Sequence, residues 1–143
     1  MPTHAEERIF PYTSEQLFHI VADVEKYPEF LPWCMASRIT DRQEGYFLAD
    51  LVIGYKMVRE KFGSKVSITP NSLIHVEYLS GPMKYLSNYW KFKDLDDGRC
   101  KVDFYVDFEF KNPILQSVIS AFFHEAVKRM VKAFEDRAKA LHD

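Results

Sequence analysis

The histidines and cysteines of this chain are the residues best suited to acid–base, nucleophilic or metal chemistry, but they form no familiar catalytic pattern. The five histidines are scattered over the sequence: His4, His19, His75, His124 and His142. There is no GxSxG, HExxH or GxGxxG motif and no phosphate-binding loop. Cys34 and Cys100 are far apart and form no CxxC pair, so neither a disulfide framework nor a metal site is expected. We therefore predict that the protein is not an enzyme.

A weaker candidate for acid–base chemistry is a set of three residues on neighbouring predicted strands, Glu60, His75 and Glu77. They would reach the apolar face of a sheet only if the strand registers were shifted by one residue. A buried carboxylate or histidine there could act as an acid or base. A solvent-exposed strand face is the commoner position for such residues, and we favour it. Cys34 follows an apolar run, has no basic neighbour in sequence and is predicted to be buried and unreactive.

The most informative stretch is residues 23–34, with the sequence DVEKYPEFLPWC. It combines three aromatic residues with two prolines: Tyr27, Pro28, Phe30, Pro32 and Trp33. Prolines restrict the backbone, so the rings can be presented at the mouth of a pocket at little cost in conformational entropy. The alternative is a hydrophobic plug at one end of a sheet, and both interpretations fit the sequence.

A long C-terminal helix is the element expected to organise the fold. Asn112 and Pro113 are typical of an N-cap and a first helical position, and no glycine or further proline occurs up to His142. Up to Val127 the only full charge is Glu125, so this half is predicted to cover an apolar cavity. Packing on a sheet alone is the alternative. The residues expected to form the buried stripe are Leu115, Val118, Ile119, Phe122, Ala126, Met130, Ala133, Phe134 and Leu141.

The remaining chain predicts a short strand, a short helix and six consecutive strands. A strand is expected over residues 4–10 and a helix over 14–24, with a capping box between Thr13 and Gln16. Pro28 is expected to end helical structure. Consecutive strands joined by short turns form an antiparallel sheet, whose apolar face the long helix would cover. Period-two patterns predict these strands over residues 35–42, 46–53, 56–69, 73–79, 85–93 and 102–110.

Length and composition limit the classes of function. The 143 residues suggest a single domain over positions 1–143, and a hydrophobic fraction of 47% is typical of a globular protein. A net charge of −2 leaves no electrostatic footprint for nucleic acid, so DNA is not an expected partner. Residues 1–8 contain no apolar run and no stretch is long enough to span a bilayer. We expect a cytoplasmic protein, with peripheral contact at the inner face of the membrane left open.

Three motifs resemble those of the coenzyme-Q-binding START-like family, a polyketide cyclase/dehydrase-like group. The first motif is residues 23–34, the second is GPMKYL at 81–86, and the third lies in the final helix at 124–135. They occur in the order of that family, and the match covers essentially the whole chain. The family usually has Phe after the Gly-Pro pair, whereas this chain has Met83, a tolerable replacement on an apolar surface.

The resemblance implies an α+β helix-grip fold of the START/Bet v 1-like type, with a curved antiparallel sheet of six to seven strands around a long C-terminal helix. It also implies a hydrophobic cavity that binds ubiquinone or a similar polyprenyl lipid. The protein would then be a quinone chaperone or carrier that supports respiratory electron transport, with ubiquinone as bound ligand and no catalytic cofactor. The residues expected to contact the ligand are Tyr27, Pro28, Phe30, Leu31, Pro32, Trp33, Phe62, Leu86, Trp90, Val118, Phe122, Ala126 and Met130.

Two other functions are compatible with the sequence. The wider group contains a ribosome-association toxin, and the basic residues Lys128, Arg129 and Lys132 would be the sequence support for a ribosomal contact. A solvent-exposed helix face explains the same cluster more simply. The group also contains polyketide cyclases, which would need a buried acid or base.

Membrane contact and fold stability lead to two further expectations. A lipid carrier has to reach the bilayer to load. The residues expected to touch a membrane are Phe30, Leu31, Trp33, Ile114, Leu115, Val118 and Phe122.

Phe104, Val106 and Phe108 are expected to serve the fold alone. We therefore predict that Phe122→Ala weakens ligand binding more, and stability less, than Phe108→Ala.

Overall fold

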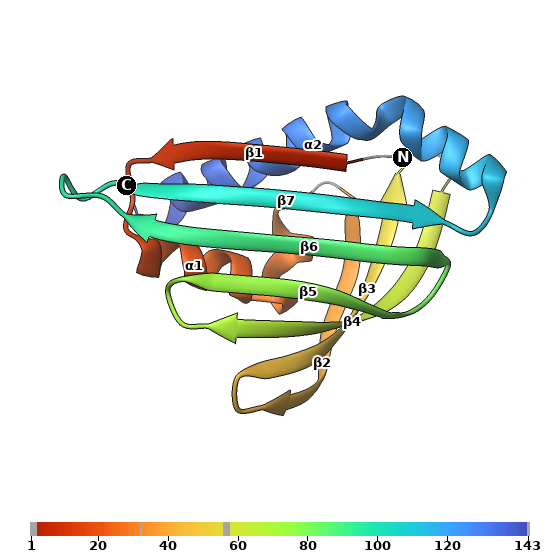
Figure 1. Cartoon of the computed structure of the whole chain (residues 1–143), viewed down its shortest axis with the longest axis horizontal. Helices are drawn as coiled ribbons and strands as arrows, with labels where there is room; N and C mark the ends of the chain where they lie inside the picture. Colours follow the sequence, from red (N-terminus) through yellow and green to blue (C-terminus); the bar gives the residue numbers. More distant parts are fainter. Residues whose placement is uncertain (1–2, 32, 56–57, 143) are drawn as a thin grey trace.

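The computed structural model describes residues 3–31, 33–55 and 58–142. Within these residues, seven antiparallel strands form one curved sheet in the order β1-β7-β6-β5-β4-β3-β2 (Figure 1). Strands β2 to β7 follow one another as neighbours, and β1 completes the edge beside β7. The strand bounds are β1 (Thr3–Phe10), β2 (Cys34–Gln43), β3 (Tyr46–Tyr55), β4 (Val58–Thr69), β5 (Leu73–Ser80), β6 (Met83–Asp94) and β7 (Cys100–Phe110).

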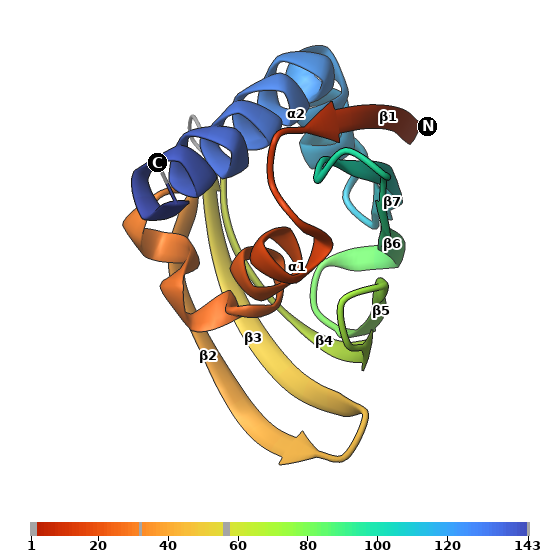
Figure 2. The ribbon, with the colours of Figure 1, turned by 90° about the vertical axis from the view of Figure 1, so that its left-hand side faces the viewer.

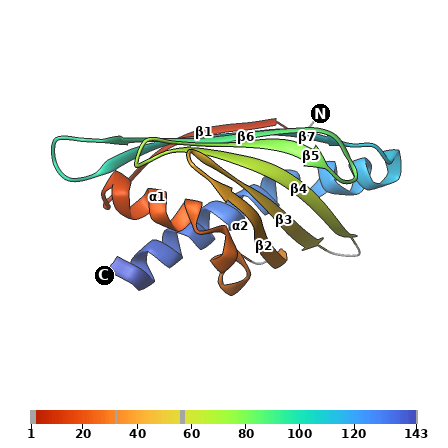
Figure 3. The ribbon, with the colours of Figure 1, turned by 90° about the horizontal axis from the view of Figure 1, so that it is seen from below.

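The helices lie on the concave side of this sheet. They are α1 (Ser14–Ala22), the short 3₁₀ helix η1 (Val24–Glu29) and α2 (Pro113–His142). Figures 2 and 3 show α2 running across the open side of the sheet, with α1 inside its curve. A sheet with one apolar face needs such a cover, because that face has to be removed from water. The predicted α+β helix-grip fold is confirmed.

Helix α1 begins where the sequence predicts. Gln16 N donates to Thr13 Oγ1 at 3.2 Å and Thr13 N donates to Gln16 Oε1 at 2.9 Å, which completes the capping box. Ser14 N and Oγ donate to the Asp94 carboxylate at 2.8 and 2.7 Å, joining α1 to the end of β6. These two hydrogen bonds hold the pKa of Asp94 below its ordinary value.

The end of the first helical region differs from the prediction. The α-helix stops at Ala22 instead of Val24, because Asp23 has a ψ of 67°, outside helical geometry. Pro28 was expected to end helical structure, but it lies inside η1. The fixed φ of proline is close to that of a 3₁₀ helix, so a short 3₁₀ segment can include it.

The predicted bounds of α2 are confirmed, but of the predicted stripe only Phe134 belongs to the most deeply buried row. Asn112 Oδ1 accepts hydrogen bonds from the backbone N–H groups of Ile114 and Leu115 at 2.9 and 3.2 Å. Of the expected stripe, Leu141 is 53% exposed. The helix carries two adjacent apolar rows, and periodicity alone does not decide which one packs most tightly. The buried row is Phe123, Val127, Val131, Phe134 and Ala138.

Gly81, in the second motif, occupies a position where a side chain would be unfavourable. It lies between β5 and β6 with a φ of +135°, a conformation that side chains rarely adopt. A Cβ atom there would lie 2.8 Å from Phe62 Cβ and 2.9 Å from Lys61 O. The glycine therefore lets this turn approach β4 closely.

Candidate functional site

An apolar cavity of about 260 Å³ lies between the concave face of the sheet and α2. Its wall comes from α1, η1, the loop after η1, strands β2 to β7 and α2. The strand registers explain how the sheet contributes to the wall. Val66 pairs with Val76, Val76 with Asn88, and Asn88 with Val106, so one row of side chains crosses four strands on the same face. The apolar cavity predicted beside the first half of α2 is confirmed.

The structure places nine of the thirteen expected contact residues on this wall. Their contact with a ligand stays a prediction. Pro28 is exposed in η1, Phe30 packs against Phe134, and Val118 is half-buried on α2 away from the wall. Pro32 lies outside the described residues. The nine are Tyr27, Leu31, Trp33, Phe62, Leu86, Trp90, Phe122, Ala126 and Met130.

Several wall residues were not predicted from the sequence. Phe104, Val106 and Phe108 line the cavity, although the sequence analysis placed them in the core of the fold and away from the ligand. The reason is that the inner face of the sheet is itself the cavity wall where α2 stands away from it. Ser64 and Asn88 also lie on the wall. Strand alternation could have identified both, because each shares a face with its neighbours at two-residue spacing.

The described part of the wall carries no Asp, Glu, Lys, Arg or His side chain. Its titratable groups are Tyr27 and Cys34. Burial raises the pKa of Tyr27 above its ordinary value, and the hydroxyl donates to Val21 O. Cys34 is buried, as predicted, and burial raises the pKa of its thiol to about 11, so little thiolate is present near neutral pH. Both groups are neutral at physiological pH.

The alternative acid–base set is not assembled at this cavity. Ile74 and Val76 of β5 line the cavity, so His75 and Glu77 between and after them point to the outer face. His75 Nδ1 lies 3.7 Å from Glu77 Oε1, and both side chains are substantially exposed. Glu60 is not part of the wall. The register shift that this interpretation required does not occur.

An aromatic cluster borders the cavity beside η1. The ring of Phe134 lies 5.6 Å from that of Tyr27, 5.2 Å from Phe30 and 5.0 Å from Trp90, measured between centroids. The Arg137 guanidinium lies over the Phe30 ring at 5.1 Å. Edge-to-face pairs of this kind stabilise a contact beyond the area they bury. The cluster therefore attaches the proline-containing segment to the C-terminal half of α2.

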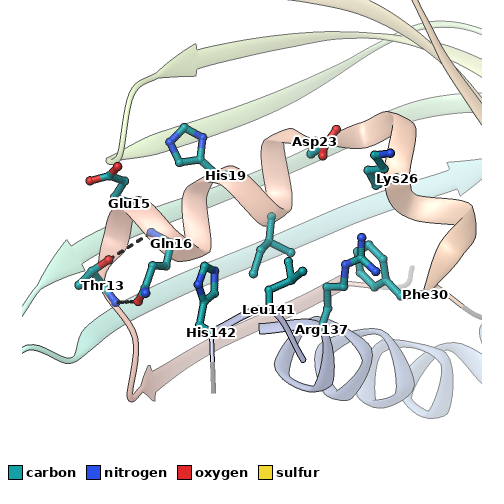
Figure 4. A pocket seen from close by; sticks show the side chains of 11 residues that line it. Thr13, Glu15, Gln16, His19, Asp23, Lys26, Phe30, Arg137, Leu141 and His142 are labelled. Carbon is teal, nitrogen blue, oxygen red and sulfur yellow. Dashed lines mark hydrogen bonds between the residues drawn. The ribbon is translucent and has the colours of Figure 1, made fainter. Parts of the chain in front are cut away.

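A second depression, of about 460 Å³, lies between α1 and the C-terminal end of α2 (Figure 4). It is lined by mixed charges, including Glu15, Asp23 and Lys26. Thr13 and Gln16 are held there by the capping box, and the side chain of Arg137 lies against Phe30. An apolar ligand is better matched by the internal cavity, whose wall is uncharged in its described part.

The residues expected to contact a membrane are not all at the surface. Ile114 is 77% exposed, whereas Leu31 is 7% exposed and Trp33 lies on the cavity wall. No helix in the described part of the chain combines the length and apolar character needed to cross a bilayer. Peripheral contact through the start of α2 stays a prediction.

Comparison with known proteins shows matches over almost the whole chain. The family model described as polyketide cyclase/dehydrase and lipid transport matches residues 10–135. The ribosome association toxin RatA of Escherichia coli K12 is 34% identical over 142 residues, covering 99% of this chain and 90% of that protein. The mitochondrial coenzyme Q-binding protein COQ10 homolog B of Xenopus laevis is 34% identical over 143 residues, covering 97% of this chain and 59% of that protein. The structure of a START superfamily protein from Mycobacterium smegmatis superposes with a TM-score of 0.83 at 19% identity, covering 97% of this chain and 98% of that one.

Proposed function

Because the chain belongs to the polyketide cyclase/dehydrase and lipid transport family, we propose that it binds ubiquinone or a similar polyprenyl lipid in the cavity between the sheet and α2. It would act as a chaperone or carrier of this lipid in support of respiratory electron transport. The observation that carries the proposal is the apolar wall, without a charged side chain in its described part. The relative named as a coenzyme Q-binding protein supports the choice of lipid.

The size of the cavity limits which part of the lipid it shelters. A volume of about 260 Å³ is slightly below the usual range for small-molecule sites, roughly 300–1,000 Å³. A cavity of this size suits the quinone ring and the first part of the tail, so we propose that the rest of a long tail lies outside it. At about 0.8 kcal/mol per buried methylene-sized group, each isoprene unit contributes about 4 kcal/mol. The ring and a short tail segment can therefore offset association costs of about 4–15 kcal/mol.

The same wall supports binding in preference to catalysis. A cyclase acting on an apolar polyketide needs a side chain that takes or gives a proton near neutral pH. On the described wall, the phenol of Tyr27 and the thiol of Cys34 are the titratable groups, and burial keeps both protonated. Our proposal therefore assigns no catalytic residue.

We expect a polyprenyl quinone to co-purify with the protein from its own host, as detected by mass spectrometry of organic extracts. We also expect short-chain ubiquinone to quench the fluorescence of Trp33 and Trp90, because both indoles line the cavity. Denatured protein at the same concentration controls for absorption by the quinone. The proposal is wrong if no polyprenyl lipid co-purifies and ubiquinone causes no saturable change in fluorescence.

A second candidate function is association with the ribosome. It is favoured by the alignment with the toxin RatA, which covers nearly the full length of both proteins. In the basic cluster on α2, Arg129 Nη2 lies 2.8 Å from Glu125 Oε1 and Lys132 Nζ lies 3.3 Å from Asp136 Oδ2, so neighbouring carboxylates offset two of its three charges. Co-sedimentation with ribosomal subunits that decreases as salt rises would favour this function, because phosphate contacts weaken with salt. The same sedimentation after loading with ubiquinone would show whether the two functions compete.

A further inference from the structure

Two uncharged polar side chains interrupt the apolar wall, Ser64 on β4 and Asn88 on β6. Ser64 is 1% exposed, and its Oγ lies 3.5 Å from Ala49 O. That distance exceeds the usual range of about 2.5–3.0 Å for a hydroxyl donor, so the Ser64 hydroxyl is weakly held. Buried polar groups normally have a good partner, and a weakly held donor facing a cavity can turn to a better acceptor there.

Asn88 has hydrogen-bonding capacity that its fold contact does not use. Its Nδ2 donates to Tyr105 O at 2.8 Å, which fixes the amide on the inner face of β6. An amide carries a second N–H and a carbonyl oxygen, and the described residues supply no further partner for either. Asn88 can therefore both donate to and accept from a bound molecule. The Tyr27 hydroxyl differs, because it is engaged by Val21 O.

The strand registers set the distance between the Cα atoms of these two residues. Ser64 is two residues from Val66, and Val66 is joined to Asn88 through the pairs Val66–Val76 and Val76–Asn88. Two strand spacings and two residue rises put the two Cα atoms about 10 Å apart across the sheet and about 7 Å apart along it, or roughly 12 Å in total. Both side chains lie on the wall of the same cavity, so one ring between them can be contacted from two sides.

We propose that Ser64 and Asn88 determine the specificity of the cavity by hydrogen-bonding the two opposed oxygens of a neutral para-quinone ring. This inference rests on the proposed function and specifies the chemistry of the head group. A fatty acid or a phosphorylated head group does not fit, because the described wall offers no cation to compensate a buried negative charge. The Asn88 amide also accepts a hydrogen bond from the hydroxyl of the reduced ring, so both redox states bind.

The test compares Ser64→Ala, Asn88→Leu and the double variant in titrations with decylubiquinone and with decylbenzene, which has the same chain length and no ring oxygens. Each single change is expected to weaken decylubiquinone about three- to tenfold, and the double variant about thirtyfold or more. Binding of decylbenzene should stay the same or become tighter. Val106→Ala is the matched control, because it removes apolar wall next to Asn88 and should weaken both ligands alike.

The outcomes separate this inference from the proposed function. If decylubiquinone binds the parent and the polar variants equally, the inference is overturned and the proposed function stands. Tighter binding of decylbenzene or palmitate than of decylubiquinone to the parent also overturns it. If the parent binds none of the three, the proposed function fails and the inference fails with it. Ser64→Ala removes only the hydroxyl oxygen. It therefore allows decylubiquinone and decylbenzene binding to be compared even if Asn88→Leu does not fold.

Discussion

Ala126→Phe is expected to reduce ubiquinone binding by on the order of a hundredfold or more while the fold keeps its stability. Ala126 lies half-buried on α2 and faces the cavity, so the added ring occupies the space that the ligand would use. Filling a cavity commonly stabilises a protein by about 0.5–2 kcal/mol, and overpacking costs about 1–3 kcal/mol. We expect these effects nearly to cancel. Fluorescence titration and thermal unfolding of the same samples measure the two quantities.

Ala121→Phe is the matched control for this variant. Ala121 is exposed on the same helix, so the same substitution adds the same ring without entering the cavity. It should leave both affinity and melting temperature close to those of the parent. Unchanged ubiquinone affinity in Ala126→Phe would show that the ligand is bound elsewhere, whatever the effect on stability.

Phe92→Ala is expected to cause a large loss of stability, about 3–5 kcal/mol, with a fall in melting temperature on the order of 10 °C. Phe92 is 6% exposed, packs against Phe18 of α1 at 6.0 Å between ring centroids, and is not part of the cavity wall. Its truncation leaves a void in the tightly packed region between α1 and β6. Ligand affinity, measured well below the melting temperature, should change little.

Phe122→Ala is the contrasting variant. Phe122 is half-buried and faces the cavity, so fewer neighbours lose contact with it when the ring is removed. It should lower the melting temperature less than Phe92→Ala and weaken ubiquinone binding more. Phe92 replaces Phe108 in this comparison, because Phe108 also lines the cavity. Equal destabilisation by the two changes, with intact binding in Phe122→Ala, would contradict the assignment of α2 as a cavity wall.

Local patterns in the sequence were sufficient to predict most elements of this fold. Asn112 and Pro113 mark the start of α2, and the capping box of Thr13 and Gln16 marks the start of α1. The period-two pattern at the end of the chain predicts β7 correctly within two residues. These signals depend on neighbours within one or two turns or along one strand, so they are readable without knowledge of distant contacts. The sequence also indicates an uncharged interior, since few acidic or basic residues occur on the apolar faces of the predicted strands and of the long helix.

Only the tertiary structure decided which of these apolar faces meet and where they leave space. The two rows on α2 have similar composition, and both Phe122 and Phe123 line the cavity, yet Phe123 is buried and Phe122 is only half-buried. Packing across long sequence separation also attaches Phe30 to Phe134 and brings Ser64 and Asn88 onto one wall. Periodicity identifies the faces of an element, but the position of a cavity depends on how far a helix stands from a twisted sheet. That distance is set jointly by side chains from many elements, and no single stretch of sequence contains it.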